Sequence, residues 1–184
     1  DSGVVIGTGF GSTSSTDAFF TGLIERGASQ ANPSLFPNTV PNACAGNMSI
    51  HFNIQGPNTT FSQKAVSGEY AVAYGTELIN RGEADYVLVG GIDELCRFLY
   101  SSYNAVRVLS TGAEGNEELM RPYDAKRNGM VLGSGCGVMV LESYRQARKR
   151  NAEIYAVING IGRNSSVTGP FSYDTDRTQY KRCM

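Results

Sequence analysis

The residues that could do chemistry are few and widely spaced. A single histidine, His51, excludes a His-rich metal site and a pair of catalytic histidines within this sequence. It stands beside Phe52 with no acidic neighbour, which favours a structural role over a catalytic one. The four cysteines, none in a C-x-x-C pair, are Cys44, Cys96, Cys136 and Cys183. This scatter predicts reduced, buried thiols in a cytoplasmic protein, and we expect neither a metal site nor a cofactor.

Two glycine-rich stretches could hold phosphate groups but lack the necessary partners. The first, Gly7-Thr8-Gly9-Phe10-Gly11, has Ser12 where G-x-G-x-x-G needs its third glycine, and no acidic residue follows at the right distance. The second, Gly133–Gly137, has no phosphate-loop lysine. Both stretches predict close backbone packing beside a strand rather than nucleotide binding.

The charge balance excludes further classes of partner. Sixteen basic and seventeen acidic residues give a net charge of −1, which argues against binding to nucleic acid or to an anionic membrane surface. The longest apolar runs, Tyr70–Tyr74 and Ile154–Ile158, are far too short to span a membrane. Arg145, Arg148, Lys149 and Arg150 form a basic run. It is most simply a solvated helix face, and the alternative is a docking site for an acidic carrier protein.

Strands alternate with helices along the chain, which predicts an α/β fold with a covered central sheet. The clearest helix has its apolar residues at 71, 74, 75, 78 and 79 and ends at Gly82. The first helix is expected to take Ser14, Ser15 or Thr16 as its N-cap. The other helices are expected at Asn42–Phe52 and Tyr144–Arg150. The expected strands are Val4–Ile6, Asn58–Ser62, Tyr86–Gly91, Gly137–Leu141 and Tyr155–Ile161.

Both ends of the chain look cut. The first strand begins almost at residue 1, and residues 176–184 begin a helix without reaching a cap. We therefore expect residues 1–184 to be one domain, truncated at both ends, of a larger fold.

A series of motifs carries a family resemblance over nearly the whole chain. In order they are Gly56-Pro57-Asn58, Ser67-Gly68, Arg81–Asp85, Val89-Gly90-Gly91, Arg107–Thr111, Arg121–Asp124, Gly129–Gly133 and Gly135–Glu142. This series resembles the β-ketoacyl-[acyl carrier protein] synthases, the acyltransferases that condense acyl units in fatty-acid and polyketide assembly. The resemblance implies a dimeric, thiolase-like layered fold of two related α/β halves. This chain would supply the first half, and the catalytic histidine pair would lie outside it.

The resemblance also implies that the nucleophile is missing. Active members carry a cysteine two residues before the Ser67-Gly68 pair, where the helix start favours a thiolate, and that position here is Ala65. Two further departures are Ser134 and Ser166, where active relatives place acidic residues. The pattern favours a non-catalytic subunit of the chain-length-factor type. There are two alternatives. The first is a genuine synthase, either with an engineered Cys→Ala change or retaining decarboxylase activity. The second is a stand-alone α/β scaffold domain.

The same resemblance implies which proteins this chain would pair with and which residues would line its acyl tunnel or face the dimer partner. A chain-length factor pairs with an active ketosynthase as a heterodimer, whereas a synthase forms a homodimer, and both work with an acyl carrier protein. Phe10 falls where condensing enzymes limit acyl length, although an ordinary core aromatic is an equal alternative. Leu35, Thr39 and Phe61 fall near the dimer-facing wall, and the strand Asn58–Ser62 is expected at the dimer interface.

Overall fold

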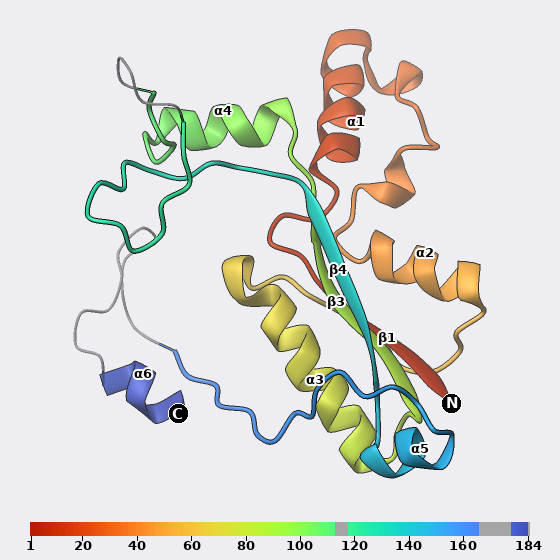
Figure 1. The fold of residues 1–184 in the computed structure, drawn as a ribbon. Coiled ribbons are helices and arrows are strands. Elements are labelled where there is room, and N and C mark those ends of the chain that lie inside the picture. Colours follow the sequence, from red (N-terminus) through yellow and green to blue (C-terminus); the bar gives the residue numbers. More distant parts are fainter. Residues whose placement is uncertain (113–117, 166–177, 184) are drawn as a thin grey trace. The chain divides into compact units, whose positions relative to one another are not determined.

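The computed structural model describes residues 1–112, 118–165 and 178–183. It divides into two compact units, Asp1–Ser143 and Tyr144–Met184, which are treated separately below (Figure 1). Within its described residues the second unit contains two short helices, α5 (Tyr144–Lys149) and α6 (Thr178–Cys183).

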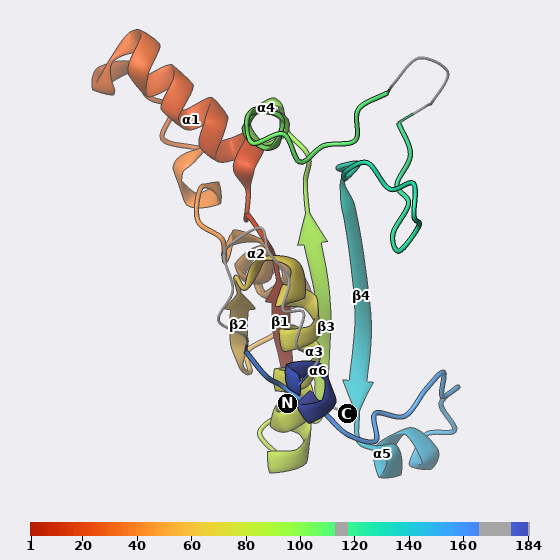
Figure 2. The ribbon, with the colours of Figure 1, turned by 90° about the vertical axis from the view of Figure 1, so that its left-hand side faces the viewer.

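A four-stranded sheet forms the centre of the first unit. Its strands are β1 (Ser2–Gly7), β2 (Asn58–Phe61), β3 (Tyr86–Asp93) and β4 (Gly135–Glu142). They lie in the order β2-β1-β3-β4, as Figure 2 shows. β1 runs parallel to both β2 and β3, and β4 runs antiparallel to β3. The α/β prediction is confirmed, and these strands match four of the five expected from sequence.

Four helices connect the described strands, and the second and third of them pack on the sheet. They are α1 (Thr13–Arg26), α2 (Ala43–Phe52), α3 (Ser67–Arg81) and α4 (Arg97–Ala105). Three single 3₁₀ turns lie between them, namely η1 (Ala28–Gln30), η2 (Phe36–Asn38) and η3 (Lys64–Val66). Among the described helices, none has the length and apolar character needed to cross a membrane.

The core follows from the alternation of side chains along β1. Val5 packs with Ala71 and Leu78 of α3, whereas Val4 and Ile6 pack on the other face around α2. All three β1 side chains are at most 1 % exposed. The two helices therefore cover opposite faces of the sheet, as Figure 1 shows. Because β1 is covered on both faces and paired on both edges, it is the fixed element from which the adjoining loops extend.

Helix α3 ends as its sequence predicts. Gly82 adopts a left-handed φ of 70°, and its N–H bonds to the carbonyl of Ile79. The N–H of Glu83 bonds to the carbonyl of Leu78 at 3.0 Å, which completes a Schellman motif. The end of α3 thereby fixes where the chain turns into β3.

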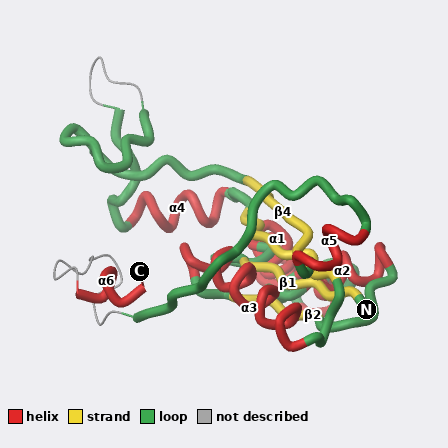
Figure 3. The backbone as a smooth tube through the Cα atoms, turned by 60° about the horizontal axis from the view of Figure 1, so that its bottom comes forward, coloured by secondary structure: helices red, strands yellow, loops and turns green. Residues whose placement is uncertain are grey.

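Two expectations about local structure are wrong. α1 begins at Thr13, earlier than predicted, with Ser12 at the N-cap and no side-chain cap bond from that serine. Tyr155–Ile161 forms no strand in the described part of the chain, and Figure 3 shows it as loop. Its β-branched residues favour extended backbone, but a strand also needs a hydrogen-bonded neighbour. This stretch has none among the described strands, and Tyr155 is 91 % exposed.

Candidate functional site

The position expected to carry a nucleophile lies in a tight turn before α3. β2 ends at Phe61, and the 3₁₀ turn Lys64–Val66 leads into the helix at Ser67. Lys64 adopts a left-handed φ of 52°, a conformation that is uncommon outside glycine. Ala65 follows it and is exposed in this unit. A methyl group at this point offers no nucleophile, acid or base.

The side-chain hydroxyl of Ser67 holds this turn through hydrogen bonds. Its hydroxyl oxygen lies 2.7 Å from the carbonyl oxygen of Lys64 and 3.0 Å from that of Thr8, and it accepts the N–H of Gln63 at 2.8 Å. The residue is only 2 % exposed. These contacts join the turn before α3 to the loop that leaves β1.

The loop carrying Phe10 lies beside the turn carrying Ala65. β1 and β2 are parallel with Gly7 opposite Phe61, so both loops leave the same end of the sheet. The N–H of Thr8 donates to the carbonyl of Phe61 at 2.9 Å. The Phe10 side chain remains 37 % exposed and meets the ring of Tyr103 edge-on at 5.8 Å. The structure thus brings two of the predicted site residues to one place.

Two carboxylates that the sequence analysis missed lie where β3 ends, and one of them, Asp93, binds the loop that carries Phe10. Asp93 accepts hydrogen bonds from Thr8, Gly9 and Phe10. Glu94 accepts the N–H of Ser14 at 2.7 Å in the first turn of α1. An acidic pair where a buried strand ends was the available signal, because such residues lie where neighbouring parallel strands also end.

The remaining wall candidates are placed separately. The ring of Phe61 packs against Tyr70 at 5.9 Å and Tyr74 at 5.6 Å, both on α3. Thr39 follows the turn η2, where its hydroxyl donates to the carbonyl of Phe36 at 2.8 Å and its own carbonyl accepts the Thr16 hydroxyl. Leu35 precedes that turn and is half-buried. Within the first unit, Phe61 therefore contacts α3, whereas Thr39 contacts α1.

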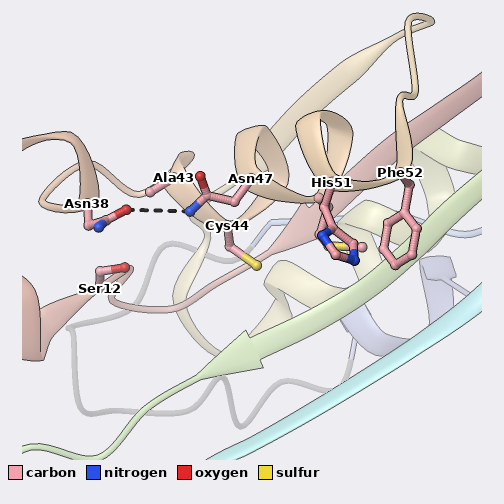
Figure 4. Close-up of a pocket in the computed structure, with 8 residues that line it drawn as sticks. Ser12, Asn38, Ala43, Cys44, Asn47, His51 and Phe52 are labelled. Atoms are coloured by element: carbon pink, nitrogen blue, oxygen red, sulfur yellow. Dashed lines mark hydrogen bonds between the residues drawn. The ribbon is translucent and has the colours of Figure 1, made fainter.

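His51 lies apart from the Ala65 turn, on α2. It lines an open hollow of about 570 Å³ together with Cys44, Asn47 and Ser12, as Figure 4 shows. Its ring stands edge-on to that of Phe52 at 4.8 Å. No group of three or more His, Cys, Asp or Glu side chains suited to a metal ion occurs among residues 1–112, 118–165 and 178–183.

Cys44 is expected to react slowly with alkylating reagents. Burial raises the pKa of its thiol, and the neighbouring Cys136 raises it further. A higher pKa leaves less thiolate at neutral pH, and the thiolate is the reactive form. The measurement is a time course with iodoacetamide, followed by peptide mass spectrometry. Exposed Cys136 should be labelled before Cys44. The difference between the two labelling rates should narrow as pH rises. In denaturant the two cysteines should be labelled at equal rates. Equal labelling rates of Cys44 and Cys136 in the folded protein would contradict this expectation.

The structure shows the contact made by one of the residues that depart from the family pattern, Ser134. The hydroxyl of Ser134 accepts the N–H of Leu95 at 2.7 Å, so this serine provides a neutral acceptor that joins the start of β4 to the end of β3. Its substitution for an acidic residue is compatible with an intact fold. Ser166, the other departure, lies outside the described residues.

Comparisons with known proteins agree with this arrangement. The model of the β-ketoacyl synthase N-terminal domain matches residues 1–147. The 3-oxoacyl-[acyl-carrier-protein] synthase 2 of Vibrio cholerae is 36 % identical over 161 residues, which are 87 % of this chain and 39 % of that protein. A β-ketoacyl synthase from Burkholderia phymatum matches with a TM-score of 0.80 at 30 % identity, over 91 % of this chain and 41 % of that one. The ishigamide ketosynthase/chain length factor matches with a TM-score of 0.79 at 26 % identity, over 88 % and 39 %.

The chain spans about two fifths of the length of these relatives. The matches cover their N-terminal half, and the thiolase-like layered fold expected from the motifs is the fold of these neighbours. The family model covers residues 1–147, which include the entire sheet and the Ala65 turn. The chain belongs to the β-ketoacyl synthase family, of which it carries the N-terminal domain.

Proposed function

We propose that this chain is part of a non-catalytic ketosynthase-like subunit of the chain-length-factor type. Such a subunit pairs with an active ketosynthase and helps to set product length during acyl-carrier-protein-dependent elongation of fatty acids or polyketides. The similarity to a ketosynthase/chain length factor supports the pairing. The free state of all its cysteines is compatible with the cytoplasm.

The observation that carries the proposal is Ala65 in the turn before α3. The four thiols of the chain lie elsewhere. Cys44 is on α2, Cys96 precedes α4 and accepts the N–H of Leu99, Cys136 is on β4, and Cys183 is in the second unit. Cys44 belongs to the α2 face of the sheet, opposite the face that α3 covers. With no thiol at the helix start, an acyl group has no acceptor of the family type.

The proposed partner contact is the outer edge of β2. This strand ends the sheet, so one row of its N–H and C=O groups has no partner strand among the described residues. Such an edge can pair with a second chain. We propose that Asn58–Phe61 pairs with the corresponding strand of the active ketosynthase, with Leu35, Thr39 and Phe61 close to the shared wall.

Phe10 is proposed to close the acyl tunnel. Its ring is neither among the fully buried side chains nor in either core cluster, and it meets the ring of Tyr103 edge-on. This partial exposure supports the tunnel role over that of an ordinary core aromatic. A ring fixed at the end of a tunnel would exclude longer chains because their last carbons would overlap it.

A second candidate is an active synthase in which Ala65 replaces a cysteine. The observation that favours it is the 36 % identity to a 3-oxoacyl-[acyl-carrier-protein] synthase. In that case the protein would pair with a second copy of itself, and restoring the cysteine would restore condensation.

Intact-mass analysis tests the proposed function. The complete subunit and its partner ketosynthase are incubated with an acyl-carrier thioester. We expect acyl mass on the partner and none on this chain, because the Ala65 turn has no thiol. Native mass spectrometry of the mixture should give one copy of each subunit. An acyl adduct on this chain, for example at Lys64, or a homodimer alone, would contradict the proposal.

A further inference from the structure

The carboxylate of Asp93 organises the loop that carries Phe10. Asp93 is the last residue of β3 and is half-buried. One carboxylate oxygen accepts the Thr8 hydroxyl at 2.8 Å and the Phe10 N–H at 3.2 Å, and both oxygens lie 3.0 Å from the Gly9 nitrogen. Hydrogen bonds to an ionised acceptor are roughly twice as strong as neutral ones.

The next N–H in the loop reaches the same carboxylate through Thr8. The Thr8 hydroxyl donates to Asp93 and accepts the N–H of Gly11 at 2.8 Å. Three successive N–H groups, from Gly9 to Gly11, therefore point to one carboxylate directly or through one hydroxyl. Successive N–H groups arranged in this way form an anion-binding concavity. Here the protein's own side chain fills it, so the loop has one preferred conformation.

The segment that follows Asp93 also holds the Phe10 ring. Tyr103, which meets that ring edge-on, lies on α4, and α4 begins four residues after Asp93. The backbone of Phe10 is thus held by the end of β3 and its side chain by the next helix. Glu94, by contrast, accepts the N–H of Ser14 in the first turn of α1, and among the described residues it has no hydrogen bond to the loop that carries Phe10.

We propose that Asp93 is a positioning residue for product length. It fixes where the Phe10 ring stands and so sets the longest acyl chain that the tunnel admits, although it need not touch that chain. This inference rests on the proposed function of Phe10 as the end of the tunnel. Loss of the carboxylate leaves the N–H groups of Gly9 and Phe10 without their acceptor, so the loop can move and the tunnel can lengthen.

The test is Asp93→Asn in the complete subunit, assayed with its partner ketosynthase and carrier protein. Asparagine keeps the shape but turns one acceptor oxygen into an N–H₂ donor facing other donors. We expect the product distribution, measured by mass spectrometry, to move by at least one elongation step toward longer chains. The matched control is Glu94→Gln, which removes the adjacent charge and should leave product length unchanged. A purely structural role for Asp93 would lower the melting temperature without moving the length distribution.

Phe10→Ala separates this inference from the proposed function. If Phe10→Ala lengthens the products and Asp93→Asn does not, the positioning role is wrong and the tunnel role stands. If Phe10→Ala itself changes nothing, the tunnel role is wrong. Should Asp93→Asn fail to fold, Thr8→Val decides, because it removes the bridging hydroxyl at nearly constant volume. Longer products from Thr8→Val support the inference, and unchanged products overturn it.

Discussion

Replacing Ala65 with cysteine is expected to give the subunit a covalent acyl adduct but no condensation. The new thiol would stand in the turn before α3, where the helix dipole and unpaired N–H groups stabilise a thiolate. It could then accept an acyl group from a carrier thioester. Condensation also needs donors that stabilise the charge formed from the extender unit, and Ala65→Cys adds none.

The measurement is intact mass after incubation with acyl-carrier thioester, followed by a condensation assay without an active partner. We expect a change from no adduct to about one acyl group per chain, since one reactive thiol accepts one acyl group. Val66→Cys is the matched control, because it places a thiol one residue further along the same turn. Full condensing activity from Ala65→Cys alone would favour the active-synthase candidate.

Gly7→Ala is expected to prevent folding of the domain. Gly7 is the last residue of β1, and a Cβ there would overlap the carbonyl of Ser67 and the nitrogen of Gly68. Those atoms are backbone at the start of α3, so no side chain can rotate away. Relieving the overlap means moving the helix off the sheet, and we expect a loss of more than about 4 kcal/mol in the free energy of unfolding.

Gly46→Ala provides the matched control. Gly46 lies within α2, and a Cβ there would meet nothing within 4 Å. Alanine in a helix interior is favoured over glycine by roughly 0.5–1 kcal/mol, so this variant should be neutral or slightly more stable. Yield of folded protein and denaturant unfolding by circular dichroism compare the two. A Gly7→Ala protein that unfolds at the same midpoint as the parent would show that α3 packs less closely than the structure indicates.

Features set by neighbours in sequence were predictable. The apolar spacing of α3 and the glycine that follows it specify both the buried face and the end of the helix. The continuous apolar run at Tyr86–Gly91 predicts a buried strand because both of its faces are covered. The Ala65 position was implied by the family resemblance, which places the nucleophile two residues before the Ser67-Gly68 pair.

Features set by distant residues were not predictable. The start of α1 was misplaced because its first turn receives an acceptor from Glu94, 80 residues away, rather than from a local serine. The Asp93 network joins residues 83 to 85 positions apart, and no spacing rule reveals such a contact. Tyr155–Ile161 was predicted as a strand because propensity reports preference for extended backbone, whereas pairing depends on another part of the fold.

The position of β1 between β2 and β3 has a consequence for synthesis on the ribosome. Val4 pairs with Asn58 on one side and with Leu88 on the other, so both partners of the strand emerge long after it. At roughly 5–20 residues per second, about 4–17 s separate Val4 from Leu88. During that interval three apolar side chains that end fully covered lie on a strand that lacks at least one of its two partners. We therefore expect the nascent chain to be most prone to aggregation before β3 arrives.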